Sequence, residues 1–256
     1  TPNNAILVVV GDVQPREVFT LAEKYYGPIK AREVKPVQAP AEPKQDGERR
    51  VRVAAPAEVP SLILGYHVPV LAPGKSAVEW EPYALDVLTG VLDGGDSARF
   101  KRELVRDARV AADADASYSA VGRAPGMLYI EGTPARGRDV KELESALRAQ
   151  VKRLRDEPVS AEELARVKAQ VAARNVFQRD SYYYQARLLG TLAVTGLDVR
   201  LLDQYVERVN AVTAEQVQAV ARQYLTDANL TVGVLDPLPV SGRKPRIKQG
   251  GSDHGR

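Results

Sequence analysis

The stretch TDANLTVGVLDP, residues 226–237, decides the fold because the chain opens with a similar stretch, TPNNAILVVVGDV, residues 1–13. In both, a Thr is followed three residues later by Asn and then by six apolar, β-prone residues, 5–10 and 230–235. A polar turn followed by a short apolar run of this kind predicts a buried strand. We therefore expect a strand at each end of the chain.

The same pattern at both ends suggests two copies of one structural unit. Only the last part of the first copy is then present, so we expect this sequence to belong to something longer, with part of its chemistry outside it. The alternative is two unrelated strands that look alike, because Thr-x-x-Asn before an apolar run is a short pattern.

Length and composition are those of a globular protein. The 256 residues suffice for one large domain or up to two typical ones, and 44% are hydrophobic and 27% charged. No apolar run approaches the roughly 18 residues of a membrane span. The absence of Cys excludes disulfides, thiolate zinc sites and a Cys nucleophile. The compartment is not determined, and bacterial periplasm and cytoplasm are both compatible with the sequence.

The positive charge of the chain lies in its tail. Residues 237–256 hold five basic residues and one acid, a net +4, which leaves −1 for the rest of a chain whose formal total is +3. A nucleic-acid-binding protein carries its positive field on the folded surface. Here that charge lies on a Pro/Gly-rich segment that we expect to be disordered, so no nucleic-acid partner is predicted.

Four segments follow from the breaks in the pattern. Residues 1–29 form a strand and a helix that Pro15 opens and Gly27 ends. Residues 30–47 contain three prolines among charges and are expected to be a linker. Residues 48–236 form the main unit, and 237–256 the basic tail.

The main unit is predicted to contain two strands, two helices, two strands, five helices and a last strand. Strands that follow one another without a helix between them favour an α+β fold, with a largely antiparallel sheet and helices packed on one face. Asp96 is the expected N-cap of the second helix, and Ser160 and Thr213 open capping boxes. The expected strands are 49–54 (half-buried), 61–68, 110–121, 127–133 and 230–235, and the expected helices are 78–92, 97–107, 140–154, the one after Ser160, 178–193 (separate or its continuation), 199–209 and the one after Thr213.

The two histidines do not form a catalytic site in this stretch. A catalytic zinc takes about three protein ligands, and the chain has only His67, in an expected strand, and His254, in the tail. Neither H-E-x-x-H nor G-x-S-x-G is present. We therefore predict no metal ligand and no catalytic residue here.

Three other groups have two interpretations each. Residues 93–97, DGGDS, are an anion-binding turn or, because Asp93 and Asp96 repel phosphate, a plain turn between helices. Asp113 and Asp115 are two residues apart and share one face of a strand. They are either a pair of carboxylates for acid/base catalysis or part of the solvated face of an edge strand. The run Tyr182-Tyr183-Tyr184 lines a groove or packs against a neighbouring domain.

The order of these segments resembles the insulinase-like zinc metallopeptidases, the pitrilysin and mitochondrial-processing-peptidase group. Residues 1–29 resemble the end of the catalytic half-domain, and 48–236 resemble the non-catalytic half that follows it. Gly95, Ser97 and Arg99 fit the Gly-rich turn and helix start of that family. The other segments that carry the resemblance are SLILGYHVP (61–69), the stretch from EPYALDVL to ADADASY (81–118), GMLYIEGTPARG (126–137) and TAEQVQAVARQYLTDANLTVGVLDP (213–237).

The resemblance implies that the zinc site, an inverted H-x-x-E-H with a distal Glu, precedes Thr1. No cofactor is then expected in this stretch, and zinc is expected in the first half-domain. The second half helps to close a chamber around the peptide and contacts it through an Arg followed seven residues later by a Tyr. Arg106 fits the Arg, but the seventh residue after it is Asp113 rather than Tyr. Either substrate is bound by Arg106 with another residue, for which Tyr118 is our candidate, or this half is mainly structural.

Three functions compete. The chain is the C-terminal half of a zinc metalloendopeptidase, inert alone; or a piece of a metal-free scaffold subunit that pairs with a catalytic chain; or a peptide-binding interaction domain. The expected partners are a peptide or protein substrate and a catalytic half-domain in the same or another chain, and we expect a dimer. Peptide capture in this family is expected to use edge-strand addition.

Overall fold

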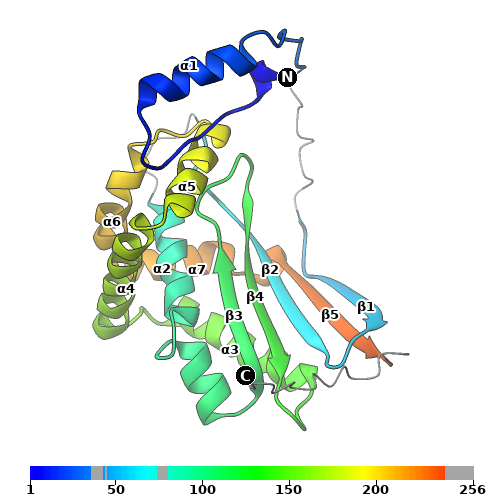
Figure 1. Cartoon of the computed structure of the whole chain (residues 1–256). Helices are drawn as coiled ribbons and strands as arrows, with labels where there is room; N and C mark the ends of the chain where they lie inside the picture. The colour runs from blue at the N-terminus through cyan, green and yellow to red at the C-terminus, as the bar shows by residue number, and fades with distance from the viewer. Residues whose placement is uncertain (36–42, 44, 74–79, 240–256) are drawn as a thin grey trace, which may run out of the picture.

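The computed structural model describes residues 1–35, 43, 45–73 and 80–239. The predicted order of strands and helices is confirmed for the main unit, from β1 to β5 (Figure 1). The elements are η1 Pro2–Asn4, α1 Pro15–Tyr26, β1 Arg49–Pro56, β2 Ser61–Val68, α2 Glu81–Asp93, η2 Phe100–Asp107, β3 Ala111–Tyr118, β4 Gly126–Pro134, α3 Val140–Asp156, α4 Ala161–Arg179, α5 Tyr182–Thr195, α6 Leu201–Ala211, α7 Ala214–Tyr224, η3 Asp227–Asn229 and β5 Leu230–Leu238.

One five-stranded sheet runs in the order β1-β5-β2-β4-β3. The last strand, β5, lies between the first two and pairs parallel with β1 and antiparallel with β2, while the remaining pairs are antiparallel. β1 and β2 are separated by only residues 57–60, yet they are not neighbours in the sheet (Figure 1). The α+β fold with a mostly antiparallel sheet is therefore confirmed.

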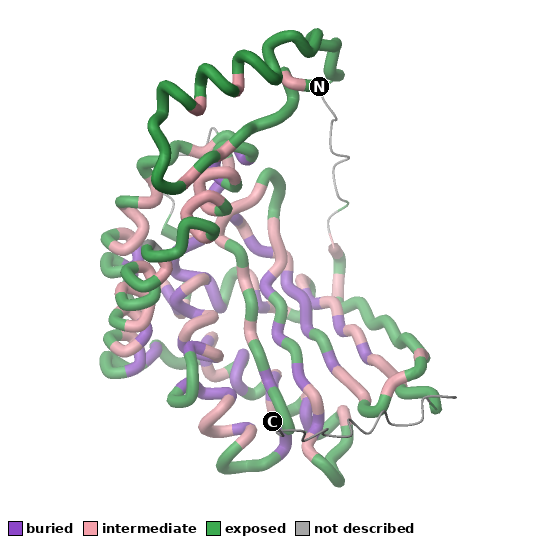
Figure 2. Tube along the Cα trace, viewed as in Figure 1, coloured by how far each residue is buried: buried purple, intermediate pink, exposed green. Residues whose placement is uncertain are grey.

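The core lies between one face of the sheet and the helices packed on it (Figures 1 and 2). Leu64 of β2, Ile130 of β4, Leu88 of α2 and Val220 of α7 are completely buried there. Side chains alternate between the two faces of a strand, so the intervening residues form an open face. The helices thus cover one side, and the other side is left for contacts.

Local hydrogen bonding sets the helix boundaries as the sequence indicates. Ser160 and Thr213 form the capping boxes that were expected, and Asp139 forms a third. The segment 178–193, for which two interpretations were open, is a helix of its own. α4 ends at Arg179, and Ser181 caps α5 by accepting a hydrogen bond from the amide of Tyr184.

The predicted strand at residues 5–10 is wrong. The turn before it is nevertheless the one that precedes β5: the Asn4 amide donates to the Thr1 carbonyl at 3.0 Å, and the Asn229 amide donates to the Thr226 carbonyl at 3.0 Å. After that turn β5 finds partners on both sides, whereas residues 5–10 pair with no strand of the described chain. Most of this segment is exposed (Figure 2). An apolar run becomes a strand only where a neighbouring strand accepts its backbone hydrogen bonds.

Two smaller expectations are also corrected. We predicted that β1 buries the face that carries Val51 and Val53. β1 instead lies at the edge of the sheet, seven of its eight residues are exposed, and these two valines are each 51% exposed. The second helix is a π-helix that begins at Phe100, and its cap residue is Arg99 rather than Asp96. Its wider turn shows in the bond from the Ala108 amide to the Glu103 carbonyl, five residues back.

Some predictions fall outside the described residues. These are most of the linker (36–42 and 44), the first two residues of the 78–92 helix, and the tail from 240 on, with His254. Where the chain is described again, the Gln45 side chain donates to the Leu230 carbonyl at 2.7 Å, so the end of the linker region is attached to the start of β5.

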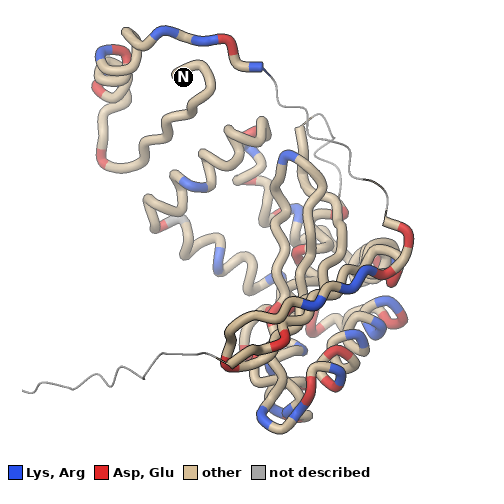
Figure 3. Tube along the Cα trace, turned by 90° about the vertical axis from the view of Figure 1, so that its right-hand side faces the viewer, with Lys and Arg blue, Asp and Glu red and all other residues tan. Residues whose placement is uncertain are grey.

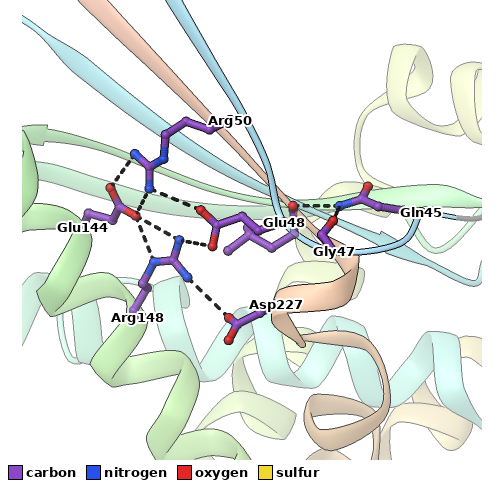
Figure 4. A network of polar contacts seen from close by, with 8 residues as sticks. Gln45, Gly47, Glu48, Arg50, Glu144, Arg148 and Asp227 are labelled. Carbon is purple, nitrogen blue, oxygen red and sulfur yellow. Dashed lines mark hydrogen bonds and ion pairs between the residues drawn. The ribbon is translucent and has the colours of Figure 1, made fainter.

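A network of charges joins β1, α3 and the turn before β5 (Figure 4). Arg148 of α3 donates to Glu48 at 2.8 Å and to Glu144 at 2.9 Å, and Glu144 also accepts from Arg50 of β1 at 3.0 Å. Asp227 lies 3.4 Å from Arg148. These groups are partly exposed, so each pair contributes little by itself, but together they fix where β1 enters the sheet.

A buried ion pair connects α4 to the start of the π-helix. Arg99 and Glu163 are 3% and 8% exposed, and the guanidinium donates to both carboxylate oxygens at 2.7 and 2.8 Å. Glu163 is also the capping-box residue that accepts from the Ser160 amide. The Arg99 guanidinium lowers the pKa of Glu163 from 4.5 to about 2.

Glu163→Gln tests this pair. Glutamine keeps the capping box but leaves Arg99 buried without a counter-charge, so we expect the free energy of unfolding to fall by about 3 kcal/mol. Because the folded pKa is depressed, the stabilisation is complete above pH 4.5 and is lost as pH falls toward 2. Urea unfolding as a function of pH measures both effects. The matched control, Glu162→Gln on the exposed side of the same helix turn, should change little, and an equal loss in both variants would contradict the assignment.

Candidate functional site

The open face of the sheet is apolar near β1 and becomes acidic toward β3. The strand register aligns one row across all five strands, from Val51 through Gly233 and Ile63 to Glu131 and Asp115. The apolar members of this row are exposed, as is Tyr129 on the same face of β4. A rigid sheet with an exposed apolar strip and an acidic border is chemically suited to contact an extended peptide.

Asp113 and Asp115 form the acidic border, on the edge strand β3. Lys101 of the π-helix makes an ion pair with Asp113 and lies 3.9 Å from Asp115. The hydrogen bond from Lys101 lowers the pKa of Asp113, whereas burial and then the neighbouring Asp113 raise the pKa of Asp115. Both side chains are about half exposed, which is the geometry of a solvated edge with a bound cationic side chain.

The structure does not bring Arg106 and Tyr118 together. Arg106 is exposed at the end of the π-helix, just before β3 begins, and donates to the Asp96 carbonyl at 2.6 Å. Tyr118 is the last residue of β3, so the eight residues of that strand separate them by roughly 25 Å. The Tyr118 hydroxyl donates to the Pro69 carbonyl at 2.6 Å, and burial raises its pKa.

Tyr118 also borders a cavity of about 350 Å³ on the helix side of the sheet. The cavity lies between α2, α4, α5 and α6, and its walls include Asp86, Arg174 and Tyr205. The Tyr205 hydroxyl donates to Asp86, and burial raises the pKa of that carboxyl group. Sequence reasoning missed these residues because each belongs to a different helix, and no spacing along the chain links them.

A second and larger cavity, of about 730 Å³, lies where β2 ends and borders His67, Gln45 and Asn229. The His67 carbonyl accepts from the Asn229 side chain at 2.7 Å. Within the described ranges, no three His, Cys, Asp or Glu side chains gather as a metal site. The described residues therefore do not fit a zinc centre.

Basic and acidic residues are interspersed over most of the chain in the view of Figure 3, whereas β1 begins with the basic stretch RRVR, residues 49–52. None of the helices that the structure describes has both the length and the apolarity needed to cross a membrane.

Comparison with known proteins decides the family. The family model described as the peptidase M16 inactive domain matches residues 1–171, which is more than half of the chain. This chain belongs to the peptidase M16 inactive-domain family. The resemblance inferred from the sequence is thereby confirmed.

Individual relatives agree with this family. The zinc protease PqqE of Helicobacter pylori is 28% identical over 239 residues, which cover 92% of this chain and 52% of that protein. A solved protease from Helicobacter pylori is 26% identical with a TM-score of 0.79, over 89% of this chain and 54% of that one. This M16 chain thus spans about half the length of these two relatives.

A shorter relative has the same fold. The solved inactive peptidase domain of a putative zinc protease from Bordetella parapertussis is 22% identical with a TM-score of 0.61, and the match covers 75% of this chain and 98% of that one. At this identity the likeness shows the fold alone.

Tyr118→Phe tests what the phenol of this M16 chain does. Its loss leaves the Pro69 carbonyl without that donor, so we expect the free energy of unfolding to fall by about 1 kcal/mol in denaturant titration. Tyr129→Phe, at an exposed position of the open face, is the matched control and should be neutral. An unchanged stability of Tyr118→Phe would contradict the structural role and leave substrate contact as its main function.

Proposed function

We propose that this chain is the non-catalytic half of a zinc-dependent metalloendopeptidase and that it helps to close a chamber around a peptide substrate. Its M16 inactive-domain family supports this, as does the similarity to zinc proteases over about half of their length. In this arrangement the zinc and its ligands belong to a catalytic half-domain. The present half supplies a wall and peptide contacts, and it is inert alone.

The observation that carries the proposal is the apolar surface of residues 1–35. Leu7, Phe19 and Tyr25 are 59%, 68% and 64% exposed, and helix α1 contains no buried residue. Residues 5–10 have the composition of a buried strand but no strand partner in the described part of the chain. Exposed apolar surface of this extent marks an interaction site, and the sheet of a catalytic half-domain is the partner that would supply the missing strand pairing.

On this proposal, residues 1–29 complete the catalytic-type half, 30–47 connect the halves, 48–236 form the inert half, and 237–256 are a tail. The boundary before the tail is corrected by two residues, because β5 continues to Leu238. The open face of the sheet is the wall that borders the chamber. Its apolar row from Val51 to Ile63 would contact peptide side chains, and its acidic border at Asp115 would favour basic groups. The substrate roles of Arg106 and Tyr118 remain part of this proposal.

A second candidate is a piece of a metal-free scaffold subunit that pairs with a catalytic chain. The described residues form no zinc site, and this observation agrees equally well with both candidates. The sequence that precedes this stretch in the whole protein distinguishes them, because the first requires H-x-x-E-H there and the second requires that motif to be missing.

Peptidase assays of separate and combined halves test the proposal. The chain alone should neither hydrolyse peptides nor bind stoichiometric zinc, whereas a mixture with the catalytic half of the same protein should hydrolyse a peptide that neither half cleaves alone. The control is the same mixture with the first His of the H-x-x-E-H motif changed to Ala. Turnover or tight zinc binding by the isolated chain would refute the proposal.

Hydrogen exchange tests the pairing directly. In the isolated chain the amides of residues 5–10 should exchange rapidly, because no strand accepts them, while those of β5 should be strongly protected. Addition of the catalytic half should slow exchange in residues 5–10 and leave β5 unchanged. Equal protection of both segments in the isolated chain would contradict the idea that the opening strand lacks its partner.

A further inference from the structure

The cavity between α2, α4, α5 and α6 has features of a small-molecule site that the proposed function does not use. Its volume of about 350 Å³ lies within the range of about 300 to 1,000 Å³ usual for ligand pockets. Four helices and the end of β3 contribute to its walls, and these helices lie close together beside the sheet (Figure 1). The walls thus come from elements that the core already holds in place.

A buried phenol in this cavity lacks a partner. Tyr83 of α2 is 1% exposed, and its hydroxyl has no hydrogen-bond partner among the described residues. A buried tyrosine hydroxyl normally finds one, so this group is available to a ligand. The Tyr83 ring lies 5.9 Å from that of Tyr205, whose hydroxyl donates to Asp86. The phenol and the carboxylate therefore border the same part of the cavity.

The charged groups of the cavity have opposite signs. Asp86 is half-buried in the wall, and burial raises its pKa, although the hydrogen bond from Tyr205 and the charge of Arg174 lower it. Arg174 of α4 and Arg187 of α5 also border the cavity, and both residues are exposed. A ligand with a cationic group near Asp86 and an anionic group near the two arginines would form charge-assisted hydrogen bonds with all three side chains.

The remaining wall is apolar. Leu188 and Leu192 of α5 and Leu201 and Leu202 of α6 provide a surface that suits an aliphatic side chain. We propose that this cavity binds a free α-amino acid with an apolar side chain, its ammonium group at Asp86 and Tyr83 and its carboxylate at Arg174 and Arg187. This site is on the helix side of the sheet, and of the two residues proposed to bind substrate, Arg106 and Tyr118, it shares Tyr118.

Calorimetric titration of the full chain with L-leucine tests the site. We expect saturable binding that weakens at least about tenfold for N-acetyl-leucine, which lacks the ammonium group, and for leucinamide, which lacks the carboxylate. The dipeptide Leu-Leu distinguishes the source of the ligand: weaker binding than leucine supports a free amino acid, and tighter binding overturns this assignment in favour of a peptide. No saturable heat up to about 10 mM leucine, or equal binding of N-acetyl-leucine, would also overturn it.

Three variants locate the ligand. Asp86→Asn and Arg174→Gln should each weaken leucine binding about tenfold, while the exposed substitutions Asp107→Asn and Arg136→Gln should not change it. Tyr83→Phe removes the unpartnered hydroxyl, so it should weaken binding several-fold while the thermal midpoint of the free chain stays equal or rises. Undiminished binding by Tyr83→Phe, or a lower midpoint of that variant, would refute the role of this phenol.

Discussion

The sheet depends on the insertion of its last strand between its first two. β5 pairs parallel with β1 and antiparallel with β2. Since β2 also pairs with β4, it is β1 that depends on β5 for its place in the sheet. The Gln45 side chain and the charges around Arg148 hold the segment before β1 near the start of β5 (Figure 4). Because β1 and β5 are far apart in the sequence, their pairing is expected to form slowly during folding.

The helices restrict function to particular surfaces. They fill one face of the sheet, and the pair of Arg99 and Glu163 fixes α4 against the turn that precedes the π-helix. The open face is then a flat wall, and the space left between α2, α4, α5 and α6 is a cavity. On our two proposals, the peptide wall and the small-molecule cavity lie on opposite faces of the same sheet, and Tyr118, at the end of β3, borders the cavity.

The opening segment shows that strand formation depends on the neighbouring strands as well as on the local sequence. Residues 1–4 and 226–229 close the same turn with the same hydrogen bond, and six apolar residues follow in each case. Only the second copy is a strand, because only it has neighbours to accept its backbone groups. Exposed Leu7, Phe19 and Tyr25 extend this unpartnered surface along α1. We have proposed that a catalytic half-domain is the neighbour that covers this surface.

The sequence by itself determined the order of the elements from β1 to β5, the capping boxes at Ser160 and Thr213, the helix between Pro15 and Gly27, and the family. These depend on neighbours within a few residues or on ordered motifs. Only the tertiary structure decided that residues 5–10 are not a strand, that Arg106 and Tyr118 lie at opposite ends of β3, and that Asp86 shares a cavity with Arg174. Strand pairing and cavities are formed by residues far apart in the chain, and no local pattern encodes which of them meet.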